Sequence, residues 1–251
     1  MAIPVKNAEQ IRKMRRAGEI VAGAHELVKK YAKAGVTTDE LDSLVSGFLK
    51  SKGAASNFLD YNGFPKSICT SLNEVVIHGI PSETRLKDGD LLSIDIGAVI
   101  DGYHGDAART VLIGEASDDA LNLVHVTEQS FFVGIEHAKS GNHLHDVSKA
   151  IQDYVERNGF SVVREYCGHG IGRAMHEAPQ IPNYKNSSSG RGPRLQSGMT
   201  LAVEPMVNIG TFEIEMMPDG WTVVTKDGKL SAHYENTILV TDGKPEILTI
   251  I

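Results

Sequence analysis

The chain has 251 residues, of which 41% are hydrophobic and 23% charged, and its formal net charge at pH 7 is −7. These proportions are ordinary for a globular protein and give enough chain for a sizeable core. The acidic balance argues against a nucleic-acid partner, since no basic surplus is present to neutralise phosphates. No stretch reaches the apolar length of a membrane span, and the start lacks a secretory apolar region, so we expect no membrane partner and a cytoplasmic location.

Two helices are predicted at the start of the chain. Asn7 is a suitable N-cap for a helix over residues 7–32, in which apolar residues recur at helical spacing. Thr38 is predicted to cap a second helix, which Gly53 ends. The remaining elements are predicted as strands over 66–79, 198–209, 212–217, 222–225 and 232–241, helices over 117–139 and 143–158, and a loop over 187–198.

Two strands joined by the Asp-Gly dipeptide at 101–102 place two aspartates on one face of a sheet. Such a dipeptide between apolar runs is typical of a two-residue hairpin turn. This turn pairs Asp106 with Gly97 and puts Asp95 on the same face, roughly 7–8 Å from Asp106 or less. Gly97 is expected to leave space beside them. Two carboxylates at this distance repel unless a cation joins them. The hairpin therefore predicts either a cation site or a pair of solvent-exposed acids.

The second half of the chain repeats segments of the first in the same order. In one of these alignments Asp95 falls on Glu204, so each half supplies an acid at the same strand position. Two matches at nearly the same offset indicate a duplicated unit. We expect one domain made of two halves, approximately residues 1–115 and 116–251, related by a pseudo-twofold axis with a site between them. The aligned segments are 85–95 with 194–204 and 32–53 with 138–159.

Three further candidate ligands lie in the second half. In YCGHGIG, His169 stands between glycines, where the backbone is free to bend and present the imidazole. Glu204 lies in the apolar strand LAVEP, and Glu235 precedes another apolar strand in HYENTILV. Each of these residues alone is more often structural. Together with Asp95 and Asp106 they form an oxygen-rich set without cysteine, unlike a structural zinc site. Such a set suits two divalent ions such as Mn, Fe, Co or Zn.

The segments IHGIP, IDIGAVIDGYHGD, CGHGIGRAMHEAP, GMTLAVEP and HYENTILV resemble type I bacterial methionine aminopeptidases of metallopeptidase family M24, and the resemblance covers essentially the whole chain. It implies an α/β (α+β) pseudo-twofold "pita-bread" fold, in which helices pack on one side of an antiparallel sheet. It implies a hydrolase that removes the initiator methionine from nascent proteins when the second residue is small. It also implies a ligand set for two divalent metals, with Asp106 and Glu235 bridging them, Asp95 completing the first site, and His169 and Glu204 completing the second.

The same resemblance assigns catalytic and substrate-binding roles. Glu204 would take a proton from the attacking water and pass it to the leaving amine. His176 would contact the scissile carbonyl and steady the oxyanion, and His78 would lie near the scissile amide nitrogen. Without the resemblance, either histidine is more often an ordinary partly buried side chain. The positions that match the family's methionine pocket are Tyr61, Phe64, Cys69 and Trp221.

The chain departs from some relatives around this pocket. Phe58, Phe64 and Met175 stand where some relatives carry Cys, Tyr and Phe, and Gly97 stands where some carry Thr. These changes leave the shape of the pocket open. The resemblance also implies a monovalent cation, Na or K, bound through backbone near Asn73, Val75 and Ser231.

Two other functions remain open at this stage. A proline-directed peptidase of the same fold would share the five ligands, and a binding protein that lost its metals would share the fold alone. The family's work on nascent chains implies an encounter with the ribosome, and a monomer is the family's default. The sequence does not select the physiological metal or the surface that meets the ribosome.

Overall fold

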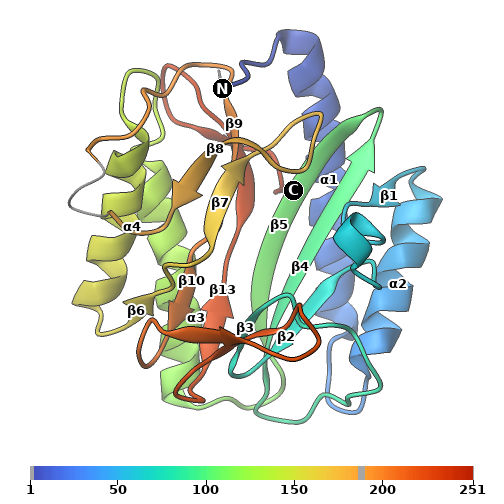
Figure 1. The fold of residues 1–251 in the computed structure, drawn as a ribbon. Coiled ribbons are helices and arrows are strands. Elements are labelled where there is room, and N and C mark those ends of the chain that lie inside the picture. Colours follow the sequence, from blue (N-terminus) through green and yellow to red (C-terminus); the bar gives the residue numbers. More distant parts are fainter. Residues whose placement is uncertain (1–2, 186–189, 251) are drawn as a thin grey trace.

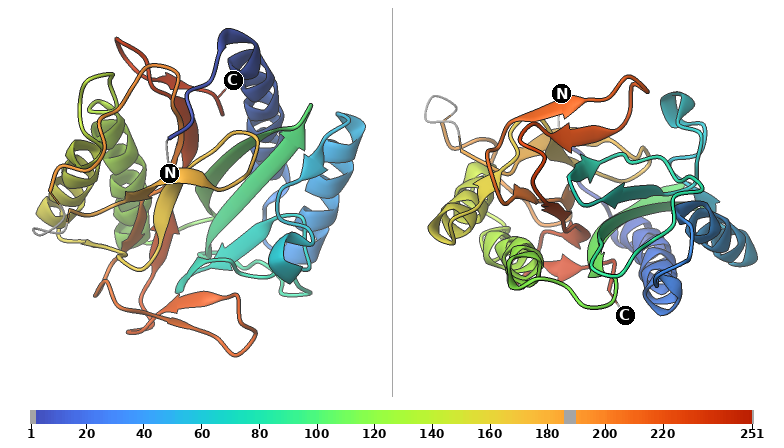
Figure 2. Two further views of the ribbon diagram at one scale, coloured as in Figure 1. Left: turned by 45° about the horizontal axis from the view of Figure 1, so that its top comes forward. Right: turned by 90° about the horizontal axis from the view of Figure 1, so that it is seen from below.

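The computed structural model describes residues 3–185 and 190–250, and its helices lie in two pairs, at the left and right of a set of antiparallel sheets in Figure 1. Seen from below, the helices form one layer and the strands the other (Figure 2). This arrangement confirms the predicted fold class. The helices are α1 (Ala8–Tyr31), α2 (Thr38–Ser51), α3 (Asp118–Ile135) and α4 (Leu144–Arg157).

The helix boundaries follow from capping side chains. Asn7 caps α1 as predicted, and its side chain accepts a hydrogen bond from the Gln10 N–H. The predicted cap of α2 is wrong by one residue, because Thr37 is the extended residue whose hydroxyl accepts from the Glu40 N–H. The Glu40 carboxylate in turn accepts from the Thr37 N–H at 2.7 Å, which completes a capping box. Thr38 is therefore the first residue inside the helix.

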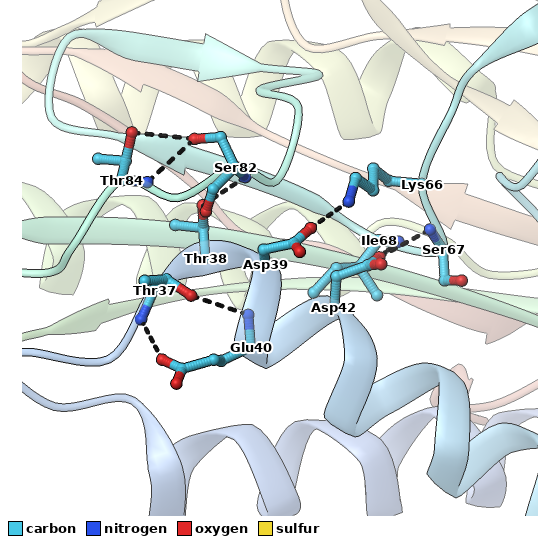
Figure 3. Close-up of polar contacts among 10 residues, drawn as sticks. All are labelled: Thr37, Thr38, Asp39, Glu40, Asp42, Lys66, Ser67, Ile68, Ser82 and Thr84. Carbon is cyan, nitrogen blue, oxygen red and sulfur yellow. Dashed lines mark hydrogen bonds and ion pairs between the residues drawn. The ribbon is translucent and has the colours of Figure 1, made fainter.

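The first turns of α2 are tied to the chain that follows the helix (Figure 3). The Thr38 hydroxyl exchanges hydrogen bonds with the backbone of Ser82, at 2.8 and 3.0 Å. The Asp42 carboxylate accepts from the N–H groups of Ser67 and Ile68, at 2.7 and 3.1 Å. Strand β2 (Cys69–Leu72) begins at the next residue, so these bonds fix the start of a strand that contributes to the cavity described below.

The predicted hairpin is confirmed with its register. Strands β4 (Leu91–Ile100) and β5 (Tyr103–Leu112) pair so that Asp95 is opposite Ala108 and Gly97 is opposite Asp106. Asp101 and Gly102 both have positive φ, at 53° and 72°, as a type I′ turn requires.

Three predicted strands are each interrupted, which corrects their predicted continuity. The run 198–209 is divided into β9 (Thr200–Val203) and β10 (Met206–Asn208) at Glu204 and Pro205, where proline has no N–H for a ladder. The run 232–241 is divided around Glu235. The pieces of each of these two runs join different sheets. The other pieces are β13 (Ser231–His233) and β14 (Asn236–Leu239), and, from the run 66–79, β2 and β3 (Val75–Ile77).

The remaining elements complete the strand layer. Among the strands that were not predicted are β7 (Cys167–Gly170) and β8 (Glu177–Pro182), where glycine and proline weaken the strand pattern. Of the predicted loop 187–198, residues 187–189 lie outside the described residues. The other elements are β1 (Ala55–Ser56), a 3-10 turn η1 (Tyr61–Gly63), β6 (Ser161–Val162), β11 (Ile214–Met216), β12 (Val223–Thr225) and β15 (Glu246–Ile247).

Each half has its own apolar core between helices and strands. In the first half, Ile94, Ile96 and Ala107 of the hairpin pack with residues of α1 and α2. Because side chains alternate along a strand, Asp95 and Asp106 point to the opposite face of the sheet, away from the helices. A second cluster joins α3 and α4 to the strands of the second half. Of the helices that the structure describes, none is long and apolar enough to cross a membrane.

Candidate metal centre and active site

A cavity of about 450 Å³ opens on the face of the sheets that the helices leave uncovered. Both halves of the chain contribute to its lining. The first half provides the two aspartates of the β4–β5 hairpin, and the second half provides a histidine of β7 and the two glutamates at the strand interruptions. All five residues predicted as metal ligands therefore line one space: Asp95, Asp106, His169, Glu204 and Glu235.

Three of the five converge most closely. Asp106, His169 and Glu235 each offer a ligand atom, and these atoms lie within 4.8 Å of one another. Glu204 Oε1 lies 3.7 Å from His169 Nε2. His169 donates its Nδ1–H to the Gly170 carbonyl at 2.9 Å, which leaves Nε2 as the acceptor that faces the carboxylates. The ring is thus oriented as a metal ligand requires.

The acids are held by bonds that cross between the halves. Ala108 of β5 and Glu235 exchange backbone hydrogen bonds at 3.3 and 3.0 Å. The Asp106 N–H donates to the Thr237 hydroxyl of β14 at 3.0 Å. Arg109 reaches from the helix side of the hairpin, and its guanidinium donates to the Glu235 carbonyl. The interruption at Glu235 is therefore where the second half joins the hairpin of the first.

Several oxygens of these acids lack hydrogen-bond partners among the residues that the structure describes. Asp95 Oδ1, Asp106 Oδ1 and Glu235 Oε1 are buried and have no hydrogen-bond partner among residues 3–185 and 190–250. A buried carboxylate oxygen without a partner is costly unless a cation or another ligand meets it. Oxygen donors with one imidazole are what borderline and hard divalent ions prefer. The residues present therefore fit divalent metal.

Burial shifts the pKa of every member of the cluster toward its neutral form. Burial raises the pKa of Asp95 to about 7. Burial, followed by repulsion from Asp95 and Glu204, raises the pKa of Asp106. Burial and the charge of Asp106 do the same for the pKa of Glu235, as burial and Asp95 do for the pKa of Glu204. Burial lowers the pKa of His169 to about 4. Divalent cations would reverse this preference for the carboxyl groups.

Gly97 does not leave open space beside the aspartates, so that expectation was wrong. A Cβ built at Gly97 would lie 2.5 Å from Asn57 Nδ2, because the Asn57 side chain packs over the glycine. Asn57 is buried and hydrogen-bonded, donating to the Gly105 carbonyl at 3.0 Å and accepting from His104 Nδ1 at 2.8 Å. A larger residue at position 97 would displace this amide.

Two more histidines stand around the same cavity. The His176 ring lies 4.3 Å from the His169 ring, centroid to centroid, and its Nδ1 is hydrogen-bonded to the Tyr61 hydroxyl at 2.8 Å. His78 has a left-handed backbone, with φ of 59°. Burial lowers the pKa of His78 to about 4 and also lowers the pKa of His176, so both imidazoles are neutral near pH 7. The predicted catalytic residues are thus gathered at one site.

Apolar side chains form the other end of the cavity. Phe58, Phe64, Cys69 and Met175 make one buried cluster, with Trp221 packed against it. The rings of Phe64 and Trp221 meet edge to face, 5.1 Å between centroids. The predicted pocket residues therefore lie together, and Phe58 and Met175 belong to the same wall.

Sequence reasoning missed some of the lining. Ile77, Tyr166 and Cys167 also face the cavity. Tyr166 meets the His78 ring edge to face at 5.7 Å. Cys167 stands two residues before His169, so recognising an extended backbone there would have placed both side chains on the same face.

His233 is buried next to the cluster. Its Nε2 lies 4.0 Å from Glu204 Oε2 and has no hydrogen-bond partner within the part of the chain that the structure describes.

The positions predicted for a monovalent cation lie at the join of the halves. The Ser231 N–H donates to the Asn73 carbonyl at 2.9 Å, and Asn73 has a positive φ of 54°. Val75 begins β3 two residues later.

Comparisons of sequence and of structure with known proteins match nearly the whole chain. A profile of metallopeptidase family M24 matches residues 12–242. A methionine aminopeptidase of Clostridium acetobutylicum is 54% identical over 249 residues, covering 99% of this chain and 99% of that protein. The crystal structure of methionine aminopeptidase from Rickettsia prowazekii has a TM-score of 0.97 at 42% identity, covering 99% of this chain and 100% of that one. A Xaa-Pro dipeptidase from Bacillus anthracis gives a TM-score of 0.76 at 25% identity, covering 98% of this chain and 61% of that chain.

Proposed function

We propose that the five clustered residues of this chain hold two divalent metal ions. The proposal starts from the finding that the chain belongs to metallopeptidase family M24 and is an aminopeptidase that removes N-terminal methionine. The observation that carries the proposal is the set of buried carboxylate oxygens that have no partner among the described residues. Asp95, Asp106, His169, Glu204 and Glu235 would hold these ions.

Bound at this site, two divalent ions would lower the pKa of a water molecule and so supply hydroxide near neutral pH. The side chains of the protein move the proton of that water and stabilise the charge that develops on the peptide bond. Glu204 accepts the proton of the attacking water and passes it to the leaving amine. Its position supports this role, since Glu204 lines the cavity with the other proposed ligands and its Oε1 lies 3.7 Å from His169 Nε2.

The two neutral histidines act on the peptide bond itself. His176 donates a hydrogen bond to the scissile carbonyl oxygen and stabilises the negative charge that develops there. His78 lies near the amide nitrogen that becomes the leaving amine. Their place in the wall of the cavity that holds the carboxylates supports both roles.

The apolar end of the cavity receives the methionine side chain. Methionine is unbranched and polarisable and packs well against aromatic rings and sulfur. Phe64, Cys69 and Trp221 provide such a surface, and Tyr61 stands beside it. This wall therefore suits a long, unbranched apolar side chain on the first residue of the substrate.

Finer features complete the proposal. The metals are Co, Mn, Fe or Zn, and a monovalent Na or K ion is bound near Asn73, Val75 and Ser231. The enzyme acts in the cytoplasm as a monomer, on nascent chains whose second residue is small, and meets the ribosome during that work. The half-to-half contact of Ser231 with Asn73 supports the monovalent site.

A chelation experiment tests the proposal. Protein stripped of metal should release no methionine from a Met-Gly-X peptide, and Co or Mn should restore release. Release that survives rigorous metal removal would contradict the two-metal proposal. An X-Pro peptide serves as the matched substrate, and faster cleavage of it would favour a proline-directed peptidase instead.

A further inference from the structure

The Tyr61 hydroxyl makes a hydrogen bond across the mouth of the cavity to His176. Tyr61 Oη lies 2.8 Å from His176 Nδ1, and the two rings are 5.5 Å apart between centroids at an angle of 47°. Tyr61 belongs to η1 in the first half, whereas His176 lies between β7 and β8 in the second. The bond therefore joins the two halves directly beside the metal centre.

We propose that Tyr61 is a positioning residue: its hydroxyl donates to His176 Nδ1 and thereby keeps the ring proton on Nε2. This inference rests on the proposed function, in which His176 donates a hydrogen bond to the scissile carbonyl. It assigns Tyr61 a role in the reaction that differs from contact with the methionine side chain.

The chemistry of a neutral imidazole makes the position of this proton decisive. A neutral ring has one N–H donor and one acceptor nitrogen. The Tyr61 hydroxyl carries a proton that it can donate to the acceptor nitrogen of such a ring, and its oxygen lies 2.8 Å from Nδ1. When Tyr61 donates to Nδ1, the proton must be on Nε2. The opposite tautomer would turn a lone pair toward the developing oxyanion and would repel it.

The backbone around Tyr61 holds the hydroxyl in place. Its neighbours Asp60 and Asn62 both adopt left-handed conformations, with φ of 64° and 51°. The turn is closed by hydrogen bonds from the Tyr61 N–H to the Phe58 carbonyl and from the Phe64 N–H to the Tyr61 carbonyl, at 2.9 and 3.0 Å. Non-glycine residues in this region persist only where surrounding structure stabilises them. A tight, strained turn thus places Phe64 in the apolar wall and the Tyr61 hydroxyl on His176.

Tyr61 is also exposed enough for its hydroxyl to be removed without opening the core. Its side chain is 38% exposed, in contrast with Phe64 at 3%. Tyr61→Phe retains the ring, so any contact with a methionine side chain survives, and only the hydrogen bond is lost.

The test compares Tyr61→Phe with the wild type in the zinc-loaded enzyme. We expect kcat for a Met-Gly-X peptide to fall about tenfold while KM changes by less than about twofold, because one hydrogen bond to the catalytic ring is lost. In the His176→Ala background the same substitution should have no further effect on kcat. Tyr31→Phe, which removes a hydroxyl at the exposed end of α1, is the matched control and should leave kcat unchanged.

Nitrogen-15 NMR of the histidine rings gives a readout independent of activity. In the wild type, His176 should show the Nε2–H tautomer, and in Tyr61→Phe it should show a mixture of both. An unchanged tautomer together with an unchanged kcat in Tyr61→Phe would overturn the inference. If the wild type itself releases no methionine, the proposed function fails, while the NMR measurement still decides whether Tyr61 sets the tautomer.

Discussion

Buried acids occur in two regions of this molecule, and the two regions differ in the hydrogen-bond partners of the carboxylates. Near the start of α2, Asp42 is 8% exposed and accepts hydrogen bonds from the N–H groups of Ser67 and Ile68. On the open face of the sheets, Asp106 and Glu235 are 4% and 2% exposed, and each has an oxygen without a partner among the described residues. Burial raises the pKa of all three carboxyl groups.

The pKa therefore does not separate the two regions, but the hydrogen-bond partners do. A buried acid that accepts hydrogen bonds from backbone N–H groups fastens one chain segment to another, and the protein itself supplies its hydrogen-bond partners. Acids from both halves that lack such partners are stabilised only when a cation or another ligand binds their oxygens. The comparison supports a structural role for Asp42 and the proposed metal-binding role for Asp106 and Glu235.

The largest expected effect comes from a cluster acid. Asp106→Asn keeps the shape of the side chain but removes a charge that two metals would share, so kcat should fall at least about 10³-fold. The metal-free variant should unfold at the same temperature as the metal-free wild type or higher, because one of several repelling carboxylates is gone. Steady-state kinetics and thermal melting measure the two effects. A large loss of metal-free stability would place Asp106 with the structural acids.

His176→Ala should lower kcat by about 10²- to 10³-fold, because a hydrogen-bond donor to the developing oxyanion is lost. The variant should bind metal to nearly the wild-type content, since the role of His176 is toward the peptide. Elemental analysis of the purified variant beside its kinetics checks both halves of this prediction. Wild-type turnover would remove His176 from the mechanism.

Asp42→Ala tests the structural side of the comparison. Two buried N–H groups would lose their acceptor, so the free energy of unfolding should fall by about 2–4 kcal/mol. The folded variant should keep its kcat, because Asp42 lies outside the cavity. Asp42→Asn, which retains an acceptor oxygen, is the matched control and should lose less stability in urea denaturation. A loss of activity without loss of stability would break the division between the regions.

The smallest expected effect is the pH dependence of a buried histidine that does have a partner. His25 is a buried residue of α1, and its Nε2–H donates to the Ala107 carbonyl at 2.8 Å. Burial, and then the charge of Arg109, lowers the pKa of His25 to about 3, below its ordinary value of 6.5. Between those values the unfolded chain binds a proton that the folded chain does not. The stability is therefore present above about pH 6.5 and is lost as the pH falls toward 3.

Between pH 7.5 and pH 5 this histidine should account for about 2 kcal/mol of lost unfolding free energy. Urea denaturation of the metal-free protein at both values measures the loss. His25→Gln, whose amide can donate to the same carbonyl, should lose less stability over this range than the wild type. Equal losses in the two proteins would show that His25 does not titrate on unfolding in this range.

The features predicted correctly from the sequence are those that depend on residues close together in the chain. The Asp-Gly dipeptide at 101–102 determines the hairpin turn, and a two-residue turn fixes the register that pairs Gly97 with Asp106. Apolar alternation then assigns the faces of the strands, so the common side of Asp95 and Asp106 followed without further information. The Asn7 cap was predicted for the same reason.

Features that depend on distant contacts were beyond the sequence. Apolar sequence continues through Glu204 and Glu235, so continuous strands were predicted, whereas pairing with different sheets interrupts the strands there. The filling of the space above Gly97 depends on Asn57, which lies forty positions earlier in the chain. The bond between Tyr61 and His176 likewise requires the two halves to be in place.

Titration of metal-free protein with Mn²⁺ or Co²⁺ in an isothermal calorimeter is the most direct test of the central claim. The partnerless oxygens of the cluster predict that two ions bind per chain in the wild type, and that Asp106→Asn loses at least one of them while Asp42→Asn loses none. Absence of metal binding by the folded wild type, or equal binding by Asp106→Asn, would contradict the assignment of the cluster as the metal centre.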